Sequence, residues 1–268
     1  MKYIAIFLFL ISIAFTGLKA QSHQVLIATN LGDMRFVLYD DTPLHRDAFL
    51  ELARKGHFNQ TLFYRVIKDY IIQGGSKDSR NAPPGKFIGY GDPDKTVNDE
   101  ILEHHLCKRG ALCAPRQPDE VNFFKQSDIS QFFIVQGRTY RPGQLDTMEM
   151  AVNRPIRKRI YNSVYTPEKR ELLNRLKEED LPAARKLADE IKDEIDVRYA
   201  LDEGKLEFTP EQRKAYTTIG GAPEIENEYT VFGELIGGNE VIDKIAALKV
   251  DENNRPYTDV VMTVRIVE

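Results

Sequence analysis

Arg65 is the residue of this chain best suited to chemistry, because it carries a permanent charge within an otherwise apolar stretch. Residues 63–75 read FYRVIKDYIIQGG, a run rich in β-branched and aromatic residues that predicts extended structure. On a strand, Phe63 and Arg65 would share one face, and Tyr64 and Val66 would share the other. Two interpretations stay open from this pattern alone. The guanidinium either extends over apolar surface into solvent, as arginines on edge strands do, or it holds a specific ligand.

The residues that commonly bind metals are few. Cys107 and Cys113 are the two cysteines, and His104 and His105 lie just before them. In extended structure, residues six positions apart have Cα atoms on the order of 20 Å apart, beyond the reach of a disulfide. We therefore expect two free, buried thiols. Successive residues of a strand point to opposite faces, so the adjacent histidines do not predict a zinc site, and no metal or cofactor is expected.

Four segments, in order along the chain, resemble the cyclophilin family. Residues 63–75 resemble its signature, which runs Phe-His-Arg-Val-Ile, a short spacer and Gln-Gly-Gly. Residues 110–114 (GALCA) resemble its Gly-x-Leu-x-Met-Ala strand, and residues 130–134 (SQFFI) match its Ser-Gln-Phe-Phe-Ile segment. Residues 231–233 (VFG), with the helix and strand expected after them, resemble its C-terminal portion.

The resemblance implies a mainly β fold: a closed eight-stranded antiparallel barrel capped by two helices, with the active groove on its outer wall. It implies peptidyl-prolyl cis/trans isomerase (rotamase) activity, with Arg65 as the catalytic residue. It places the substrate proline in a pocket formed by Tyr70, Ile71 and Phe133. The other substrate-binding residues that it implies are Phe63, Gln73, Ala114, Pro115, Gln131, Ile225 and Tyr229.

Several positions depart from the family pattern, among them Cys113, which replaces methionine. Tyr64 and Tyr229 replace histidines, Tyr70 replaces phenylalanine, and Ile71 replaces methionine, so the pocket floor is altered but stays apolar. Pro115 stands where the family usually has asparagine. Because proline has no backbone N–H, any hydrogen bond from that amide to substrate is lost.

Rotation of an X-Pro bond breaks no covalent bond, so it needs a group that stabilises the twisted amide better than either planar isomer. In the twisted state the proline nitrogen gains a lone pair, to which a guanidinium can donate a hydrogen bond. Arginine suits this better than lysine because its donors form a rigid, always charged fork. The expected clients are proline-containing polypeptides. The alternative is a module that binds proline-containing or unfolded segments, in the manner of a chaperone, with little turnover.

Turn and capping signals predict the elements that would position these residues. Thr42 and Pro43 begin a short amphipathic helix that Gly56 ends. A hairpin is expected over residues 25–29 and 34–39, and residues 62–72 are expected to be extended up to a turn at residues 73–75. Further strands are expected over residues 110–114, 131–135, 229–233 and 260–267, with a helix over residues 240–248.

Residues 138–218 have a different composition, because 33 of these 81 residues are charged, against 29% of the whole chain. Helix starts at Thr166 and Thr209, each followed by Pro-Glu, and a stripe of apolar residues at helical spacing between positions 184 and 199 predict helices. We expect the stripe to serve packing, and Pro182 to separate two helical segments. The prediction is an α-helical insertion that splits a barrel domain of residues 24–137 and 219–268.

Residues 1–20 predict a secretory signal peptide. Lys2 is followed by uncharged, mostly apolar residues 3–18, a run too short to span a bilayer comfortably, and cleavage is expected after Ala20. We therefore expect an exported protein, periplasmic or secreted, with no membrane span in its mature form. The net charge is −4 and falls to about −6 without Lys2 and Lys19, which disfavours a nucleic-acid partner.

Overall fold

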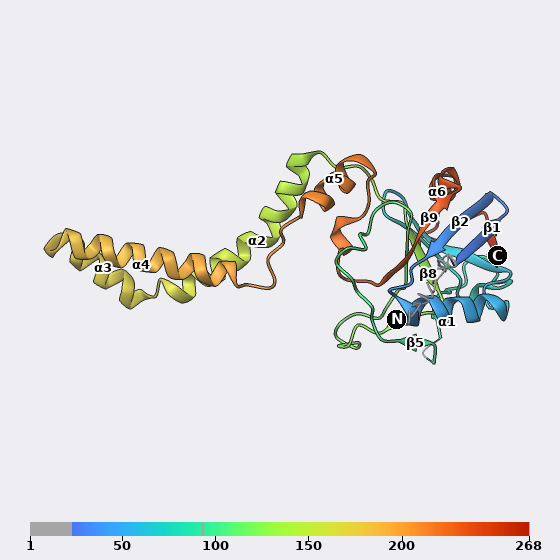
Figure 1. Ribbon diagram of the computed structural model, residues 1–268, viewed down its shortest axis with the longest axis horizontal. Helices are drawn as coiled ribbons and strands as arrows, with labels where there is room; N and C mark the ends of the chain where they lie inside the picture. Colours follow the sequence, from blue (N-terminus) through green and yellow to red (C-terminus); the bar gives the residue numbers. More distant parts are fainter. Residues whose placement is uncertain (1–22, 93, 268) are drawn as a thin grey trace, which may run out of the picture.

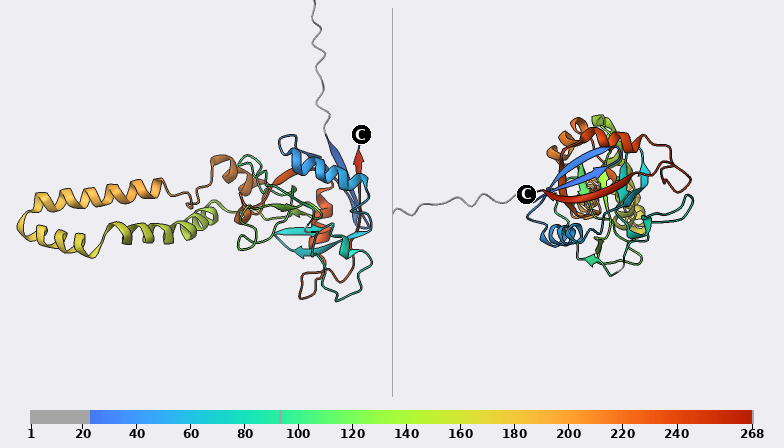
Figure 2. Two further views of the ribbon diagram at one scale, coloured as in Figure 1. Left: turned by 90° about the horizontal axis from the view of Figure 1, so that it is seen from below. Right: turned by 90° about the vertical axis from the view of Figure 1, so that its right-hand side faces the viewer.

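The main body of the computed structural model, which describes residues 23–92 and 94–267, is a closed barrel of eight antiparallel strands at one end of the molecule (Figures 1 and 2). The strands follow the order β1, β10, β3, β4, β8, β6, β9, β2 around the barrel, so the first and last strands of the chain are neighbours. Their bounds are β1 Gln24–Thr29, β2 Gly32–Leu38, β3 Thr61–Ile67, β4 Ile71–Gly74, β6 Ala111–Cys113, β8 Phe132–Val135, β9 Val231–Gly237 and β10 Val261–Val267. The expected eight-stranded barrel is therefore confirmed.

Two amphipathic helices pack on the barrel from opposite sides, above and below the strands in Figure 1. Helix α1 (Pro43–Arg54) begins with proline in its first turn and buries Phe49, Leu50 and Leu52 against the barrel core. Helix α6 (Asn239–Ala246) buries an apolar face that includes Val241 and Ile242. Both helices were expected at about these positions, and their apolar faces belong to the barrel core.

A bulge in β3 decides which side chains reach the outer surface. The pairing of β3 with β4 shifts register between Phe63 and Arg65. Phe63 and Val66 lie in the barrel core, whereas Tyr64 belongs to a separate cluster, and Arg65 lines a surface pocket. The expectation that Phe63 and Arg65 share a face is therefore wrong. A bulge inserts one extra residue into a strand, so two consecutive side chains can leave on the outer side.

The extended run expected over residues 62–72 is two strands rather than one. Asp69, with φ 61°, occupies a tight turn between β3 and β4, and its backbone N–H donates to Oε1 of Gln136 at 2.7 Å. Gln73 therefore lies within β4, paired with Arg65, and not in a turn. The strand does end at Gly74, and Gly75 has a φ of 96°. This turn, which the sequence pattern did not predict, places residues 70–73 beside Arg65.

The two cysteines are free and buried, as expected, but their expected separation is wrong. Cys107 and Cys113 lie in one buried cluster, and a hydrogen bond with the Cys113 thiol, together with burial, raises the pKa of Cys107. The chain between them is not extended. Ala111 N–H donates to Lys108 O at 3.0 Å, and Gly110 takes a φ of 85°, so the segment folds back before β6.

Four helices form a long arm that projects from the barrel between β8 and β9 (Figure 2). They are α2 Pro142–Val164, α3 Pro167–Glu179, α4 Leu181–Ala200 and α5 Pro210–Thr218. The expected helix starts are confirmed, because the side chains of Thr166 and Thr209 accept hydrogen bonds from the backbone of their first turns. Pro182 lies in the first turn of α4, directly after the end of α3. The barrel and insertion boundaries drawn from composition remain a prediction.

The arm contains two small apolar clusters, one between α2 and α4 and one at its root. The stripe on α4 packs as expected, because Ile191 contacts Ile160 and Val164 of α2. At the root, Tyr140, Leu145, Phe208 and Tyr216 form a second cluster. The arm is therefore held together along its length by packing between α2 and α4, and a second cluster supports its root.

A small ribbon of β5 (Thr96–Val97) and β7 (Ser127–Asp128), with two 3₁₀ turns at Lys77–Ser79 and Pro223–Ile225, completes the described chain. Within residues 23–92 and 94–267, no helix has the length and apolar character needed to cross a membrane. The expected signal peptide lies outside the described residues.

Candidate active site

One surface pocket of about 170 Å³ brings together eight of the eleven residues expected at the site. They come from β3, β4, β8, the segment after β6, and the segment before β9. These five strands are successive neighbours around the barrel, so residues far apart in the chain meet on one stretch of its outer wall. The pocket is lined by Arg65, Tyr70, Ile71, Gln73, Pro115, Arg116, Phe133, Ile225 and Tyr229.

The floor of the pocket is apolar and rigidly packed. Phe133 of β8 is 2% exposed, and Tyr229 meets its ring edge to face, with centroids 5.2 Å apart. Ile71 and Ile225 are also buried in the same cluster. Aromatic and branched side chains in this arrangement form a slot that suits a small apolar ring.

The polar wall of the pocket is a chain of hydrogen bonds that ends at Arg65. Nη1 of Arg65 donates to Oε1 of Gln73 at 3.2 Å, and Nε2 of Gln73 donates to the hydroxyl of Tyr64 at 2.8 Å. The Tyr64 hydroxyl donates in turn to Oε1 of Gln131, whose Nε2 donates to Asp128 at 2.8 Å. Burial raises the pKa of Tyr64, so its hydroxyl stays protonated. This row of hydrogen bonds fixes the side chain of Gln73, which in turn fixes one edge of the Arg65 guanidinium.

Among the described residues, one of the five guanidinium N–H groups of Arg65 donates a hydrogen bond, which leaves its other donors for a ligand. Arg65 is half-buried and lies at the rim of the apolar slot. A permanently charged donor beside an apolar pocket can stabilise charge or a lone pair that develops on a ligand held there.

Three expected residues do not line the pocket. Phe63 is 1% exposed and lies in the barrel core, because the bulge in β3 turns it inward. Ala114 is also fully buried in that core. Gln131 is buried behind Gln73 and bonds Tyr64, so it supports the polar wall from behind.

Arg116 lines the pocket and was not expected there. Its guanidinium lies over the ring of Tyr229, 5.4 Å from the centroid, and donates to Glu228 Oε2 at 2.6 Å and to Asp119. With its charge paired in this way, Arg116 acts as a wall that holds Tyr229 in place. Tyr64 was expected to replace a histidine, but its role in the polar wall was not expected. Neither role has a local sequence signal, because both depend on partners from other strands.

A second hollow, of about 350 Å³, lies on the other side of Arg65. It shares Arg65 and Gln73 with the first pocket and is further lined by residues 86–89 and 251–255. A ligand longer than one residue could therefore extend past Arg65 along the barrel wall.

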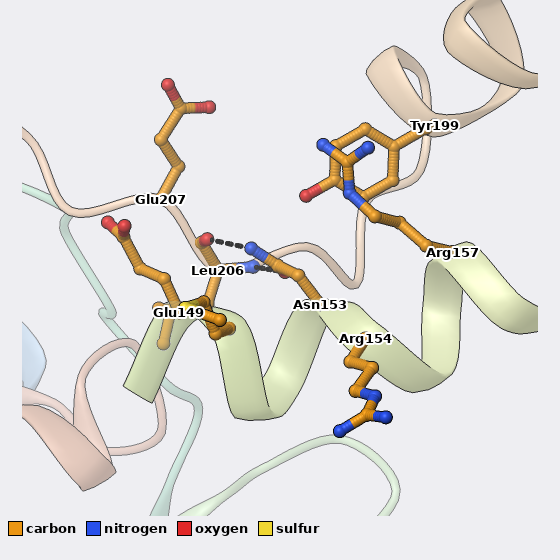
Figure 3. Close-up of a pocket in the computed structure, with 8 residues that line it drawn as sticks. Glu149, Asn153, Arg154, Arg157, Tyr199, Leu206 and Glu207 are labelled. Carbon is orange, nitrogen blue, oxygen red and sulfur yellow. Dashed lines mark hydrogen bonds between the residues drawn. The ribbon is translucent and has the colours of Figure 1, made fainter. Parts of the chain in front are cut away.

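A larger cavity, of about 580 Å³, lies on the arm and away from Arg65 (Figure 3). Two of its polar side chains hold structural contacts: the side-chain amide of Asn153 exchanges two hydrogen bonds, of 2.7 and 2.8 Å, with the backbone of Leu206. Arg157 lies over the ring of Tyr199, 3.8 Å from its centroid. These contacts join α2 to the end of α4 and the segment that follows it. We assign the chemistry to the smaller pocket on the barrel.

Comparison with known proteins shows the family of the chain. Residues 24–155 and 167–266 match the family described as "Cyclophilin type peptidyl-prolyl cis-trans isomerase/CLD", a match that runs through most of the arm. A protein of Staphylococcus saprophyticus that carries the provisional name of peptidyl-prolyl cis-trans isomerase is 28% identical over 255 residues, which are 94% of this chain and 96% of that protein. A similarly named protein of Staphylococcus haemolyticus is 27% identical over 247 residues, 91% of each chain.

The fold also resembles a solved structure, the cyclophilin type peptidyl-prolyl cis-trans isomerase of Cryptosporidium parvum. The TM-score is 0.52 with 19% sequence identity, and the match covers 92% of this chain and 98% of that one. At this identity the likeness supports the barrel fold.

Proposed function

The chain belongs to the cyclophilin-type peptidyl-prolyl cis-trans isomerase family, and on that premise we propose that Arg65 is its catalytic residue, acting on X-Pro bonds of exported polypeptides during their folding. One observation carries the assignment of the site. Arg65 borders an apolar slot floored by Phe133 and Ile71, in one pocket on the barrel wall. A proline ring would enter the slot, and the preceding carbonyl would lie at the rim.

The proposed mechanism follows from the distribution of donors. The planar amide resists rotation with a barrier of about 18–20 kcal/mol, because twisting removes its resonance. As the bond twists, the proline nitrogen becomes pyramidal and accepts a hydrogen bond from the free N–H groups of Arg65. Every 1.36 kcal/mol or so by which this contact favours the twisted state over the planar isomers gives about a tenfold gain in rate.

The walls of the pocket supply orientation. Gln73 fixes one edge of the guanidinium, so little reorganisation is needed when the substrate twists. Tyr229, held by Arg116, would close the far side over the proline ring. Pro115 contributes apolar wall, and its carbonyl accepts from Asp128 N–H at 2.8 Å, which ties the wall to the segment that supports Gln131.

Export rests on the sequence of residues 1–20, which favours a periplasmic or secreted protein. In such a compartment the clients would be newly translocated chains, whose X-Pro bonds otherwise exchange over tens to hundreds of seconds. The shared lining of the two hollows supports polypeptide clients over small prolyl compounds, because a chain could continue past Arg65 into the second hollow.

A second candidate function is a binding module with little turnover, in which the arm contacts unfolded clients. Exposed apolar side chains on the arm favour it: Met150 is 70% exposed, Val197 58% and Leu201 76%. The free donors of Arg65 favour the enzyme, because holding an apolar ring alone requires no guanidinium at its rim.

NMR exchange spectroscopy of a proline-containing peptide distinguishes the two functions. The measurement compares the wild type with Arg65→Ala. An isomerase gives cis/trans exchange cross-peaks whose rate falls at least tenfold in Arg65→Ala while the peptide still binds. Equal exchange rates for the two proteins, or binding without exchange, would support the binding module instead. Circular dichroism of the variant confirms that its barrel is intact.

A further inference from the structure

Three side chains outside the isomerase pocket converge on one point of the surface: Asp41, His104 and His105. Nε2 of His104 lies 2.9 Å from one carboxylate oxygen of Asp41, and Nε2 of His105 lies 2.8 Å from the other. The three atoms that could ligate an ion all lie within 4.8 Å of one another. Two imidazoles and one carboxylate are the ligand types that zinc and similar ions take.

The two histidines were expected to point apart, and that expectation is wrong. Residues 102–105 form a turn rather than a strand, closed by a hydrogen bond of 2.9 Å from His105 N–H to Leu102 O. The alternation of a strand therefore does not apply to them. Their ring centroids lie 4.2 Å apart, and both Nε2 atoms face Asp41.

Neighbouring contacts hold this arrangement in place. The ring of His105 stacks on Tyr39, with centroids 3.9 Å apart and planes 9° from parallel. Asp41 immediately precedes the start of α1, and Glu100, on the same loop as the histidines, accepts hydrogen bonds of 3.0 Å from the N–H groups of Leu44 and His45 there. The loop and the helix start that carry the cluster are thus joined through Glu100, which is outside the cluster itself.

The spacing lies close to what a zinc ion requires. With bonds of about 2.0–2.2 Å and tetrahedral angles, two ligand atoms of one zinc ion are separated by about 3.3 Å. The two Asp41 to histidine distances are shorter than this by roughly half an ångström, a difference that small side-chain rotations remove. We propose that Asp41, His104 and His105 form a binding site for a divalent transition-metal ion, zinc above all, with its remaining coordination positions open to water.

Binding requires each imidazole to carry its proton on Nδ1, so that the lone pair of Nε2 faces the ion. A neutral imidazole makes this change by exchange with solvent, with no net release of protons. The hydrogen bonds to Asp41 are replaced by bonds to the metal, and the carboxylate lowers the net charge of the complex. The ion would link the loop of residues 98–106 to the start of α1, which lies more than sixty positions earlier in the sequence.

Isothermal titration of the purified, untagged chain with zinc chloride tests the site. One ion should bind per chain, with a dissociation constant on the order of 10 μM, because only three ligands are offered and two of them are exposed. Asp41→Asn and His104→Gln should each weaken binding at least tenfold. His23→Gln is the matched control, because it removes a nearby imidazole that lies outside the cluster and should leave binding unchanged.

Thermal unfolding with and without zinc gives a second measurement, since an ion that binds the folded state alone raises the midpoint. The rise should be present in wild type and His23→Gln and much smaller in Asp41→Asn at the same zinc concentration. His104 and Asp41 have exposed side chains, so these variants should fold. Failure of wild-type protein to bind zinc at about 100 μM overturns the proposal, as does equal binding by His104→Gln and wild type. Isomerase activity plays no part in either readout, so the result stands apart from the proposed function.

Discussion

Arg65 and Gln73 face each other across β3 and β4, and Nη1 of Arg65 donates a hydrogen bond of 3.2 Å to Oε1 of Gln73. This bond exists because a bulge turns Arg65 outward and a tight turn at Asp69 brings β4 back beside it. The pair orients a permanent charge beside the apolar slot while leaving most of its donors free.

Replacing the glutamine of this pair should slow catalysis without removing the charge. We predict that Gln73→Ala lowers kcat/KM for a proline peptide by about tenfold, because the guanidinium loses the acceptor that orients it. The measurement is a protease-coupled or NMR exchange assay. In an Arg65→Ala background, adding Gln73→Ala should cost much less, since the two residues act together. Equal losses in both backgrounds would mean that Gln73 acts independently of Arg65.

The hydroxyl of Tyr64 should matter for activity although it lies behind the pocket. In Tyr64→Phe, Nε2 of Gln73 and Oε1 of Gln131 both lose a hydrogen-bond partner, at a cost of about 1–3 kcal/mol in folding stability. We predict a severalfold lower kcat with a smaller change in KM, measured well below the unfolding midpoint. Tyr64→His should recover part of kcat, because an imidazole nitrogen can also accept from Gln73. The control is Tyr161→Phe on the arm, which should leave both constants unchanged.

Glu226 should make folding stability depend on pH near neutrality. Burial raises its pKa to about 7, against weaker opposing bonds from Cys107 N–H and Gln212, and its Oε1 atom is buried with no hydrogen-bond partner among the described residues. A raised pKa in the folded state means that protonated Glu226 favours folding. This stability is fully present below the unfolded pKa of 4.5 and is lost as pH rises through about 7.

We therefore predict that the free energy of unfolding of the wild type declines between about pH 5 and pH 8, by at most about 3 kcal/mol. Glu226→Gln should flatten this decline and be the more stable protein at pH 8, because a neutral amide needs no proton. Denaturant unfolding at several pH values measures this decline in the free energy of unfolding. Glu224→Gln serves as the control, because that neighbouring carboxylate is exposed and should keep the wild-type slope. Parallel slopes for Glu226→Gln and wild type would contradict the assignment.

The outer part of the arm should be dispensable for isomerisation, whereas its root should not. Asn153 and Leu206 are joined by two hydrogen bonds, so a short Gly-Ser linker can replace residues 154–205 between them (Figure 3). This deletion should preserve the fold and leave turnover of a short proline peptide within about twofold of the wild type. If turnover of an unfolded protein client falls while that of the peptide does not, the arm contributes to client binding.

Deleting all of residues 138–218 should be far more harmful. It removes Tyr216, which is fully buried and bonds Glu226, and it removes the pairing of Arg138 with Gly221. Both contacts support the segment that carries Ile225 into the pocket. We expect a lower midpoint of thermal unfolding and a weaker affinity for peptide. A full deletion that behaves like the shorter one would show that the root is independent of the barrel.

Local patterns in the sequence were sufficient for most of the elements. Alternation and turn residues located the β1–β2 hairpin and the last strand, and Thr-Pro starts located α1, α3 and α5. The motif resemblance identified eight of the residues that line the pocket. These features are local or are carried by short contiguous motifs, so they can be read without knowledge of the fold.

The remaining features depend on where strands meet, which only the tertiary structure decides. The bulge that separates Phe63 from Arg65 arises from pairing with β4. The link from Arg65 through Gln73 and Tyr64 to Gln131 joins β3, β4 and the residue before β8. The convergence of His104 and His105 on Asp41 depends on a turn closed against a helix start more than sixty residues earlier. Side-chain direction is set by backbone register and by distant partners, and neither is encoded in the identity of the residue itself.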